Sequence, residues 1–130
     1  MPWFKVDDKL WSHPKALHLT STALGVWLRA GSYCADHLTD GHIEARTLHV
    51  ICPEPRPTLM RAVWELIDAG LWEEAGEGWR FHDWCDHQPT RREVEADRAA
   101  GRERQRRSRE RRGLAPVTPM SRRDSRVTDA

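Results

Sequence analysis

Cysteine is scarce in this 130-residue chain, and long apolar runs are absent. The three Cys residues, Cys34, Cys52 and Cys85, form an odd set without a C-x-x-C pair, so no disulfide framework is predicted. No window approaches the roughly 20 apolar residues that span a membrane. The first ten residues, MPWFKVDDKL, lack an apolar run after basic residues, so no signal peptide is expected. These absences predict a cytoplasmic chain with reduced thiols and no membrane partner.

Aromatic residues are missing from the C-terminal third. All seven Trp and both Phe precede residue 85. The larger apolar residues after Asp86 are only Val94, Leu114, Val117, Met120 and Val127. A folded core can therefore form from about residue 3 to residue 87, which suffices for one small domain. We expect a folded domain over 1–88, a basic helix over 89–112 and a disordered tail over 113–130.

Charge is segregated along the chain. Residues 1–88 hold 8 Lys or Arg and 13 Asp or Glu, so their net charge is 8 − 13 = −5. Residues 89–130 hold 13 Arg and 7 Asp or Glu, so theirs is 13 − 7 = +6. A basic tail most often indicates an anionic partner, with nucleic acid first among the candidates.

The N-terminal half predicts an extended segment and then a helix. PWFKV alternates apolar and polar residues, as a short strand or an extended lead-in does. A helix is expected to start after Thr20-Ser21, where either hydroxyl can cap it, and to fade near Asp36-His37. Its apolar stripe is assigned to Leu24, Trp27, Leu28, Gly31 and Ala35.

The following residues predict a strand, two helices and a hairpin. Asp40-Gly41 indicates a turn, HIE a short strand, and EARTLHVI a short helix that the prolines of CPEPRP close. A second strong helix starts near Pro57-Thr58, and Gly70 follows it as the C′ residue. Its apolar side is assigned to Leu59, Ala62, Val63, Leu66 and Ile67. GLWEE and GWRFHDW form strands joined by AGEG. This order predicts an α+β, mainly α fold: a winged helix-turn-helix with a β-hairpin wing.

A charged helix is expected after the hairpin. Thr90-x-x-Glu93 is a capping box, and residues 91–112 hold 10 Arg and 5 acids. Such a helix has almost nothing to bury, so it should project from the body as a charged rod. Residues 113–130 are rich in Pro, Ser, Thr and Arg and should be disordered.

The stretch WRFHDWCDHQPTRRE raises the possibility of a metal site or of hydrolytic chemistry. Cys85 and His87 would share a face of a strand, and Cys34 and His37 would share a face of a helix. Their spacing matches no strong zinc signature, and buried Cys with polar rim His is the simpler interpretation. His82, Asp83, Asp86 and His87 lack an identifiable nucleophile. Alternation assigns Trp79, Phe81, Asp83 and Cys85 to one face of a last strand and Arg80, His82 and Trp84 to the other. We therefore expect no metal, no cofactor and no enzymatic activity.

The basic segment is better explained as a nucleic-acid contact. A solvated helix could pair its own charges, for example Glu103 with Arg107. However, RERQRRSRERR carries 7 Arg against 2 Glu, more cations than internal pairing can use. Backbone contacts are predicted for Arg91, Arg92, Arg98, Arg102, Arg104, Arg106, Arg107, Arg109, Arg111 and Arg112. Groove contacts are predicted for Arg56, Thr58 and Arg61, with Arg80 at the wing.

Three stretches resemble a known group of proteins. They are WFKVDDKLWSHPK, GVWLRAGSYCADHLTDGHI and LIDAGLWEEAGEGWRFHDWCDHQPTRREVE, which together span about residues 3–112. They are similar to the N-terminal module of helix-turn-helix or replication-initiation proteins of actinobacterial phages and prophages. The arrangement also resembles the N-terminal winged helix of phage replisome organisers, in which HQ and a basic helix follow the last hairpin strand.

The resemblance implies binding of DNA, double-stranded by preference, at a replication origin in a bacterial or phage-infected cell. It also implies recruitment of a replicative helicase or its loader, with Thr58–Ala69 as recognition helix and Leu71–Trp84 as wing. Replisome organisers usually carry a helicase-facing domain after the basic segment, and none is apparent before Ala130. We therefore expect DNA or partner binding rather than helicase loading by this chain alone.

Two other functions remain open, and nothing indicates a homo-oligomer. One is a winged-helix transcriptional regulator. The other is a docking adaptor whose Arg-rich helix binds an acidic partner or RNA. The adaptor gains if Arg56 and Arg61 are buried or paired to Glu65 and Asp68. A zinc-dependent enzyme is a distant further alternative.

Overall fold

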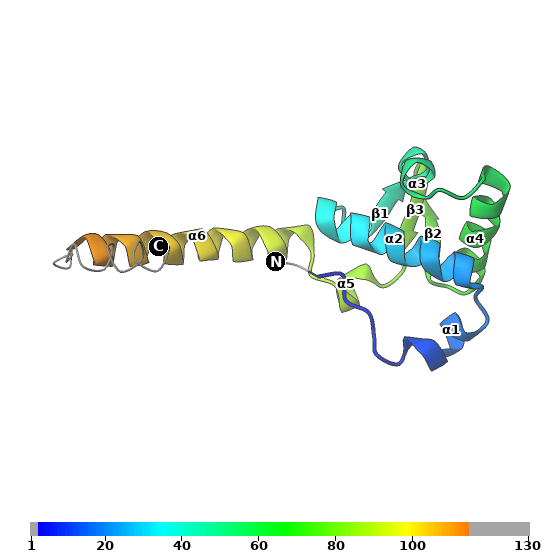
Figure 1. Cartoon of the computed structure of the whole chain (residues 1–130), viewed down its shortest axis with the longest axis horizontal. Helices are drawn as coiled ribbons and strands as arrows, with labels where there is room; N and C mark the ends of the chain where they lie inside the picture. Colours follow the sequence, from blue (N-terminus) through cyan, green and yellow to red (C-terminus); the bar gives the residue numbers. More distant parts are fainter. Residues whose placement is uncertain (1–2, 115–130) are drawn as a thin grey trace, which may run out of the picture. The chain divides into compact units, whose positions relative to one another are not determined.

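The computed structural model describes residues 3–114, which form an α+β, mainly helical structure with one small three-stranded antiparallel sheet (Figure 1). This agrees with the fold class expected at the coarse level. The chain divides into two units at residue 94, so the described residues 3–94 belong to the first unit and 95–114 to the second. The elements of the described residues are η1 (Leu10–Ser12), α1 (Pro14–Leu17), α2 (Ser21–His37), β1 (His42–Glu44), α3 (Ala45–Ile51), α4 (Arg56–Asp68), β2 (Trp72–Ala75), β3 (Gly78–Phe81), α5 (Trp84–His87) and α6 (Arg91–Leu114).

The bounds of α2 confirm the expected helix. The Thr20 side chain caps it by accepting a hydrogen bond from the backbone N–H of Ala23, at 3.1 Å. At the other end Leu38 adopts a left-handed conformation with φ of 54°. In the view of Figure 1, α2 crosses in front of the strands, and it packs on α4.

The apolar stripe assigned to α2 was wrong by about one residue. The buried residues of α2 are Ala23, Val26, Ala30, Gly31 and Cys34. Leu28, which the sequence placed on the stripe, is 52% exposed, and Trp27 is only partly buried. Small side chains on the inner face let α2 approach its neighbours closely, so the larger apolar residues lie toward its rim.

The helix α4 has the core side expected from its sequence. Leu59, Ala62, Val63 and Leu66 are at most 3% exposed, and Ile67 is partly buried against the same core. Gly70 follows at φ +79°, as expected for a C′ glycine. The N–H of Gly70 donates to the carbonyl of Ile67, and that of Leu71 to the carbonyl of Leu66. This pair of bonds is the Schellman motif, which ends α4 and aims the chain into β2.

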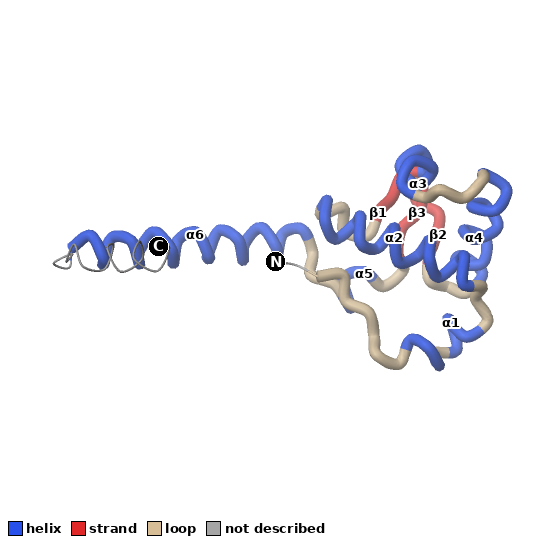
Figure 2. Tube along the Cα trace, in the orientation of Figure 1, coloured by secondary structure: helices blue, strands red, loops and turns tan. Residues whose placement is uncertain are grey.

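The sheet has the order β1-β3-β2, drawn in red in Figure 2. The expected hairpin is present: β2 pairs antiparallel with β3, and Gly76-Glu77 connects them. The short HIE strand is also confirmed and pairs with β3, with Ile43 opposite Trp79. At Gly78 a Cβ would overlap the backbone of Ile43, so β1 can approach β3 this closely only because residue 78 is glycine.

The last strand is shorter than the alternation pattern predicts. β3 ends at Phe81, and residues 84–87 form the helical turn α5. The assignment of Cys85 to the same face as Phe81 was therefore wrong, because Cys85 is exposed while Trp84 is 5% exposed. The turn is explained by packing, since it brings the Trp84 indole onto Phe81 with ring centroids 5.2 Å apart.

An aromatic cluster of four rings connects the N-terminal segment to the body: Phe4, Trp27, Phe81 and Trp84. The Phe4 ring lies 5.1 Å from that of Trp27, 6.1 Å from that of Phe81 and 5.9 Å from that of Trp84. The PWFKV segment forms no strand over its described residues and is the extended lead-in alternative. A Cβ at residue 31 would overlap the Phe4 ring, so Gly31 provides the space for it.

Two sequence predictions concern the ends of the first unit and of the chain. Gln88 and Val94 are 7% and 6% exposed, so packing in the first unit continues to residue 94. The disorder predicted for 113–130 lies outside the described residues, except for Gly113 and Leu114, which belong to α6. Among residues 3–114, no helix is long and apolar enough to cross a membrane.

Two leucine truncations test the observed helix faces. Leu66→Ala removes a side chain that is 0% exposed and should lower the free energy of unfolding by about 2–5 kcal/mol. Leu28→Ala, at a 52% exposed position, should change it by less than about 0.5 kcal/mol. Urea denaturation followed by circular dichroism measures both. A larger loss of unfolding free energy in Leu28→Ala would mean that Leu28 is buried, as the sequence predicted, and would contradict the observed face of α2.

Candidate nucleic-acid interface

The start of α6 is fixed by side chains. The N–H of Glu93 donates to Thr90 Oγ1 at 3.2 Å, and the Thr90 hydroxyl donates to Glu93 Oε1 at 3.1 Å. The Asp40 carboxylate accepts a further bond from the N–H of Arg91, at 2.6 Å. The bond from the Glu93 N–H to Thr90 confirms one of the two bonds of the capping box predicted from sequence. Together these groups satisfy backbone N–H donors that the first turn of a helix leaves unpaired.

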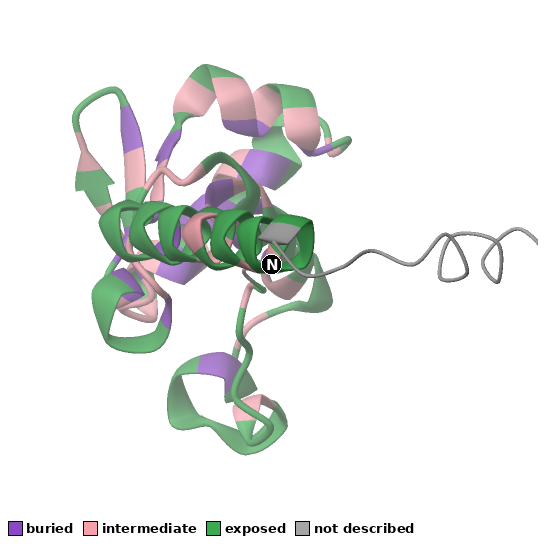
Figure 3. Cartoon of the chain, turned by 90° about the vertical axis from the view of Figure 1, so that its left-hand side faces the viewer, coloured by how far each residue is buried: buried purple, intermediate pink, exposed green. Residues whose placement is uncertain are grey.

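Beyond residue 94, α6 is a helix without a buried face. Among residues 95–113 only Gly101, Glu103 and Ser108 are partly covered, and the rest are exposed. Figure 3 colours this helix almost entirely green, the colour of exposed residues. Tertiary packing therefore contributes little to this part of α6, and its helical form depends on local propensity and on charge pairs along its own surface.

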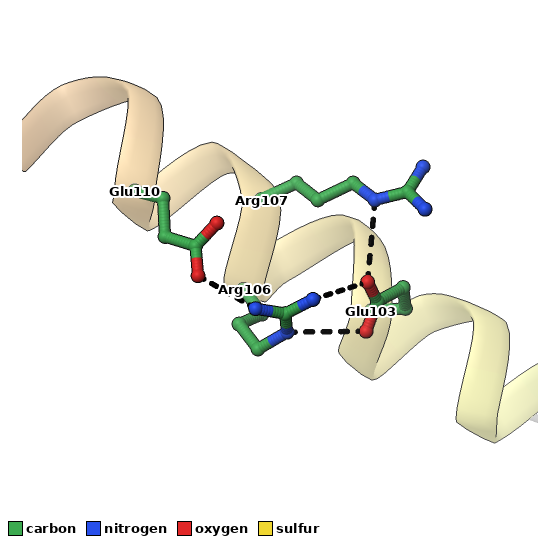
Figure 4. Close-up of polar contacts among 4 residues, drawn as sticks. All are labelled: Glu103, Arg106, Arg107 and Glu110. Carbon is green, nitrogen blue, oxygen red and sulfur yellow. Dashed lines mark hydrogen bonds and ion pairs between the residues drawn. The ribbon is translucent and has the colours of Figure 1, made fainter. Parts of the chain in front are cut away.

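Four charged side chains form a network on one side of α6 (Figure 4). Arg106 donates to Glu103 through Nε at 3.1 Å and Nη2 at 2.6 Å, and to Glu110 through Nη1 at 2.6 Å. Arg107 Nε donates to Glu103 Oε1 at 3.2 Å, which confirms the predicted Glu103–Arg107 pair. The bond from Arg106 and the weaker one from Arg107 lower the pKa of Glu103. The bond to Glu103 raises the pKa of Arg106.

A second side of α6 carries cations without carboxylate partners. At 3.6 residues per turn, positions spaced by four and three residues fall on one stripe. We call this stripe the Arg strip; it consists of Arg98, Arg102, Gln105, Arg109 and Arg112. No ion pair joins its four Arg residues to any acid of the described chain. Glu103 and Glu110 lie roughly 100° around the helix from Arg102.

The remaining predicted Arg residues of α6 divide in the same way. Arg106 and Arg107 are engaged by Glu103, as Figure 4 shows. Arg92, Arg104 and Arg111 have no ion pair within residues 3–114, but they lie on other sides of the helix. Arg91 has an interaction of its own, so it is not counted among the free cations. The sequence indicated the excess of Arg, and the structure sorts these residues into paired and unpaired ones.

The predicted groove contacts lie in the first half of α4. Arg56, Thr58 and Arg61 are all exposed, and neither Arg is paired to an acid of the described residues. The carboxylate of Glu65 is occupied elsewhere, because it accepts bonds from the N–H and the hydroxyl of Thr20 at 2.9 and 2.8 Å. The condition that would have favoured the adaptor, two arginines buried or paired, is therefore not met.

Arg80, the predicted wing contact, is part of a charge network on the hairpin. Its Nε donates to Glu73 Oε1 at 3.0 Å. The other Glu73 oxygen lies 3.5 Å from His82 Nδ1, and His82 Nε2 lies 3.5 Å from Asp83. Hydrogen bonds from Arg80 and then His82 lower the pKa of Glu73. The charge of Arg80 is thus compensated within the hairpin, unlike the charges of Arg56 and Arg61.

The residues considered for a metal do not form a shared site. Cys34 is buried and lies 3.5 Å from the carbonyl of His42, and burial raises the pKa of its thiol to about 11. Cys85 was expected to be buried, but it is exposed on α5, where it and His87 share no strand face. The His37 ring stacks on Tyr33 with centroids 4.1 Å apart. Within the described part of the chain, no three His, Cys, Asp or Glu residues are placed to hold a metal.

Comparisons of this sequence and structure with protein-family models, curated proteins and solved structures gave no match.

The charge network of α6 predicts the titration of Glu103. Because its pKa is lowered from the ordinary 4.5, its contribution to helix stability is fully present above that value. The contribution is lost as the pH falls through the lowered pKa. The side-chain carboxyl ¹³C shift of Glu103 should therefore titrate with a midpoint below 4.5.

Two variants give the control for this titration. Arg106→Gln removes the first cause of the shift, so the midpoint should move up toward the ordinary value. Arg104→Gln removes a neighbouring charge without an ion pair and should move it much less. Equal midpoints in the three proteins would contradict the network.

Proposed function

We propose that this chain is a non-enzymatic DNA-binding protein that acts in the initiation of phage or prophage replication. The observation that carries the proposal is the Arg strip: four Arg residues on one stripe of α6 without carboxylate partners in the described chain. Guanidinium groups bind phosphate oxygens through two parallel hydrogen bonds, and a row of them suits a row of phosphates.

The length of the Arg strip fits a duplex backbone. Arg98 and Arg112 are 14 residues apart in sequence (112 − 98), which corresponds to about 21 Å along an α-helix. A strand of B-DNA presents one phosphate per roughly 3.4 Å of axis, so the strip spans about six phosphates of one strand. These contacts are independent of base sequence and supply affinity rather than specificity.

The arrangement of elements before α6 supports a role for α4 in contacting base edges in a DNA groove. The order α2, β1, α3, α4 and the β2–β3 hairpin is the order of a winged helix, with α3 and α4 as the helix-turn-helix. In that arrangement α4 is the recognition helix and the hairpin is the wing. Arg56, Thr58 and Arg61 are exposed near the start of α4, where groove contacts usually originate. Arg80 contributes less to the wing contact because Glu73 neutralises it.

The role in replication rests on the resemblance of three sequence stretches to phage replication-initiation proteins. On that basis the DNA is a replication origin, double-stranded by preference, and the protein partner is a replicative helicase or its loader. A transcriptional regulator would use the same DNA contacts. Binding to origin fragments of the source genome, compared with promoter fragments, separates the two roles.

The proposed contacts predict the salt dependence of DNA binding. If the four Arg residues of the strip each neutralise one phosphate, the logarithm of affinity should fall against the logarithm of salt with a slope of about −4. Arg102→Gln/Arg109→Gln should reduce the size of this slope by about 2, because two phosphate contacts are lost. Fluorescence anisotropy of a labelled duplex over a series of salt concentrations measures the slopes.

The variant Arg106→Gln/Arg107→Gln is the charge-matched control. It removes the same two charges, but from residues that Glu103 engages. Its slope should therefore stay closer to that of the intact protein. Equal losses in both variants would mean that only total charge matters, and the Arg strip would lose its special role. No binding of any DNA by the intact protein would leave the adaptor as the better function.

A further inference from the structure

The middle of α4 carries a large aromatic side chain that the core does not use. Trp64 is 66% exposed, although the inner side of α4 is filled by residues that are at most 3% exposed. Seven large hydrophobic residues are exposed in the described chain, and Trp64 is the one that lies on α4. Burial in the fold therefore does not explain why this position holds a Trp.

Two of the neighbours of Trp64 on the surface of α4 are charged. Arg61 precedes it by three residues and Asp68 follows by four, so both lie beside it on the helix surface. Arg61 is exposed and has no acidic partner within residues 3–114. Glu65, the next residue along, holds the backbone and hydroxyl of Thr20. The Trp64 ring therefore has two charged neighbours on the helix surface, the unpaired guanidinium of Arg61 and the carboxylate of Asp68. The carboxylate of Glu65 is held by Thr20, the N-cap residue of α2.

This combination favours nucleic acid over a protein partner. Protein interfaces place their aromatic anchors within a packed apolar centre, and Met60 and Ile67 beside Trp64 are already partly covered by the core. Proteins that bind single-stranded nucleic acid instead combine cations, which contact the phosphates, with exposed aromatic rings, on which the bases stack. Base faces are covered in a duplex, so an indole can stack only on a base that has left its pair or its stack.

We propose that Trp64 stacks on an unpaired base of DNA. Arg61, which contacts the groove of paired DNA in the proposed function, then binds the phosphate next to the opened base. This inference rests on the proposed function and deepens it: the double-stranded origin that the chain binds contains a locally opened segment. In that segment, α4 meets the opened bases. Such a preference suits a protein that acts where strands separate.

The test uses the intact chain and two labelled DNAs. One is a duplex with a central run of unpaired thymines, and the other is the fully paired duplex of the same flanking sequence. The intact protein should bind the opened DNA more tightly than the duplex. Trp64→Ala should weaken binding to the opened DNA roughly 5- to 150-fold, the range for losing one stacked base. Its binding to the paired duplex should be nearly unchanged.

Three further variants make the outcome specific. Trp11→Ala removes a Trp that is 81% exposed but lies outside α4, and it should keep the preference. Trp64→Phe should retain part of the preference, because a phenyl ring still stacks. Trp64→Leu should lose it, since the side chain is apolar but not planar. The melting temperature of each variant checks that the fold is intact.

The remaining outcomes separate this inference from the proposed function. Equal weakening of binding to the duplex and to the opened DNA by Trp64→Ala would indicate that Trp64 makes a groove contact. It would overturn the stacking inference and leave the proposed function standing. A Trp64→Leu protein that keeps the preference would do the same. If Trp11→Ala also lost the preference for opened DNA, the effect would not be specific to Trp64, and the inference would be overturned. If the intact protein binds neither DNA, the proposed function fails, and this inference fails with it.

Discussion

The folded body depends on the packing of four aromatic rings. The aromatic cluster takes one ring from the N-terminal segment, one from α2, one from β3 and one from α5, and its centroids lie within 6.2 Å of their neighbours. This cluster therefore joins parts of the chain that are far apart in sequence. The chain must turn after Phe81 to bring Trp84 into it, and residue 31 must be glycine to admit Phe4. The buried Trp72 ring, 5.4 Å from that of Phe81, connects this cluster to the rest of the core.

Local signals in the sequence were sufficient for most of the elements. The cap at Thr20, the turn at Asp40-Gly41, the C′ glycine at Gly70 and the capping box at Thr90 each act over a few residues. They gave the helices and the hairpin because their physical effect is itself local. The register of α2 was not accessible in this way. Its inner face was decided by how close α4 and the sheet come, and small residues such as Ala23 and Ala30 carry no strong signal.

In the candidate site, too, some features could be predicted from the local sequence and others depend on the folded structure. The excess of Arg after residue 90 could be counted in the sequence, and so could the Glu103–Arg107 spacing. The separation of Arg106 and Arg107 from the Arg strip requires the helix, because it depends on which guanidinium reaches which carboxylate. The compensation of Arg80 by Glu73 requires the register of the hairpin, which places the two residues opposite each other. Charge counts therefore predicted where cations are abundant, but not which of them stay available.

The Arg strip also has a consequence for the stability of α6 itself. Like charges three or four residues apart on a helix disfavour it by roughly 0.2–0.5 kcal/mol per pair. The strip contains such pairs, for example Arg98 with Arg102 and Arg109 with Arg112. A polyanion along this stripe would remove that repulsion, so the helix would be more stable bound than free. Part of the free energy of binding would then stabilise the helical form of α6. Ligand binding and the helix content of α6 would therefore be thermodynamically linked.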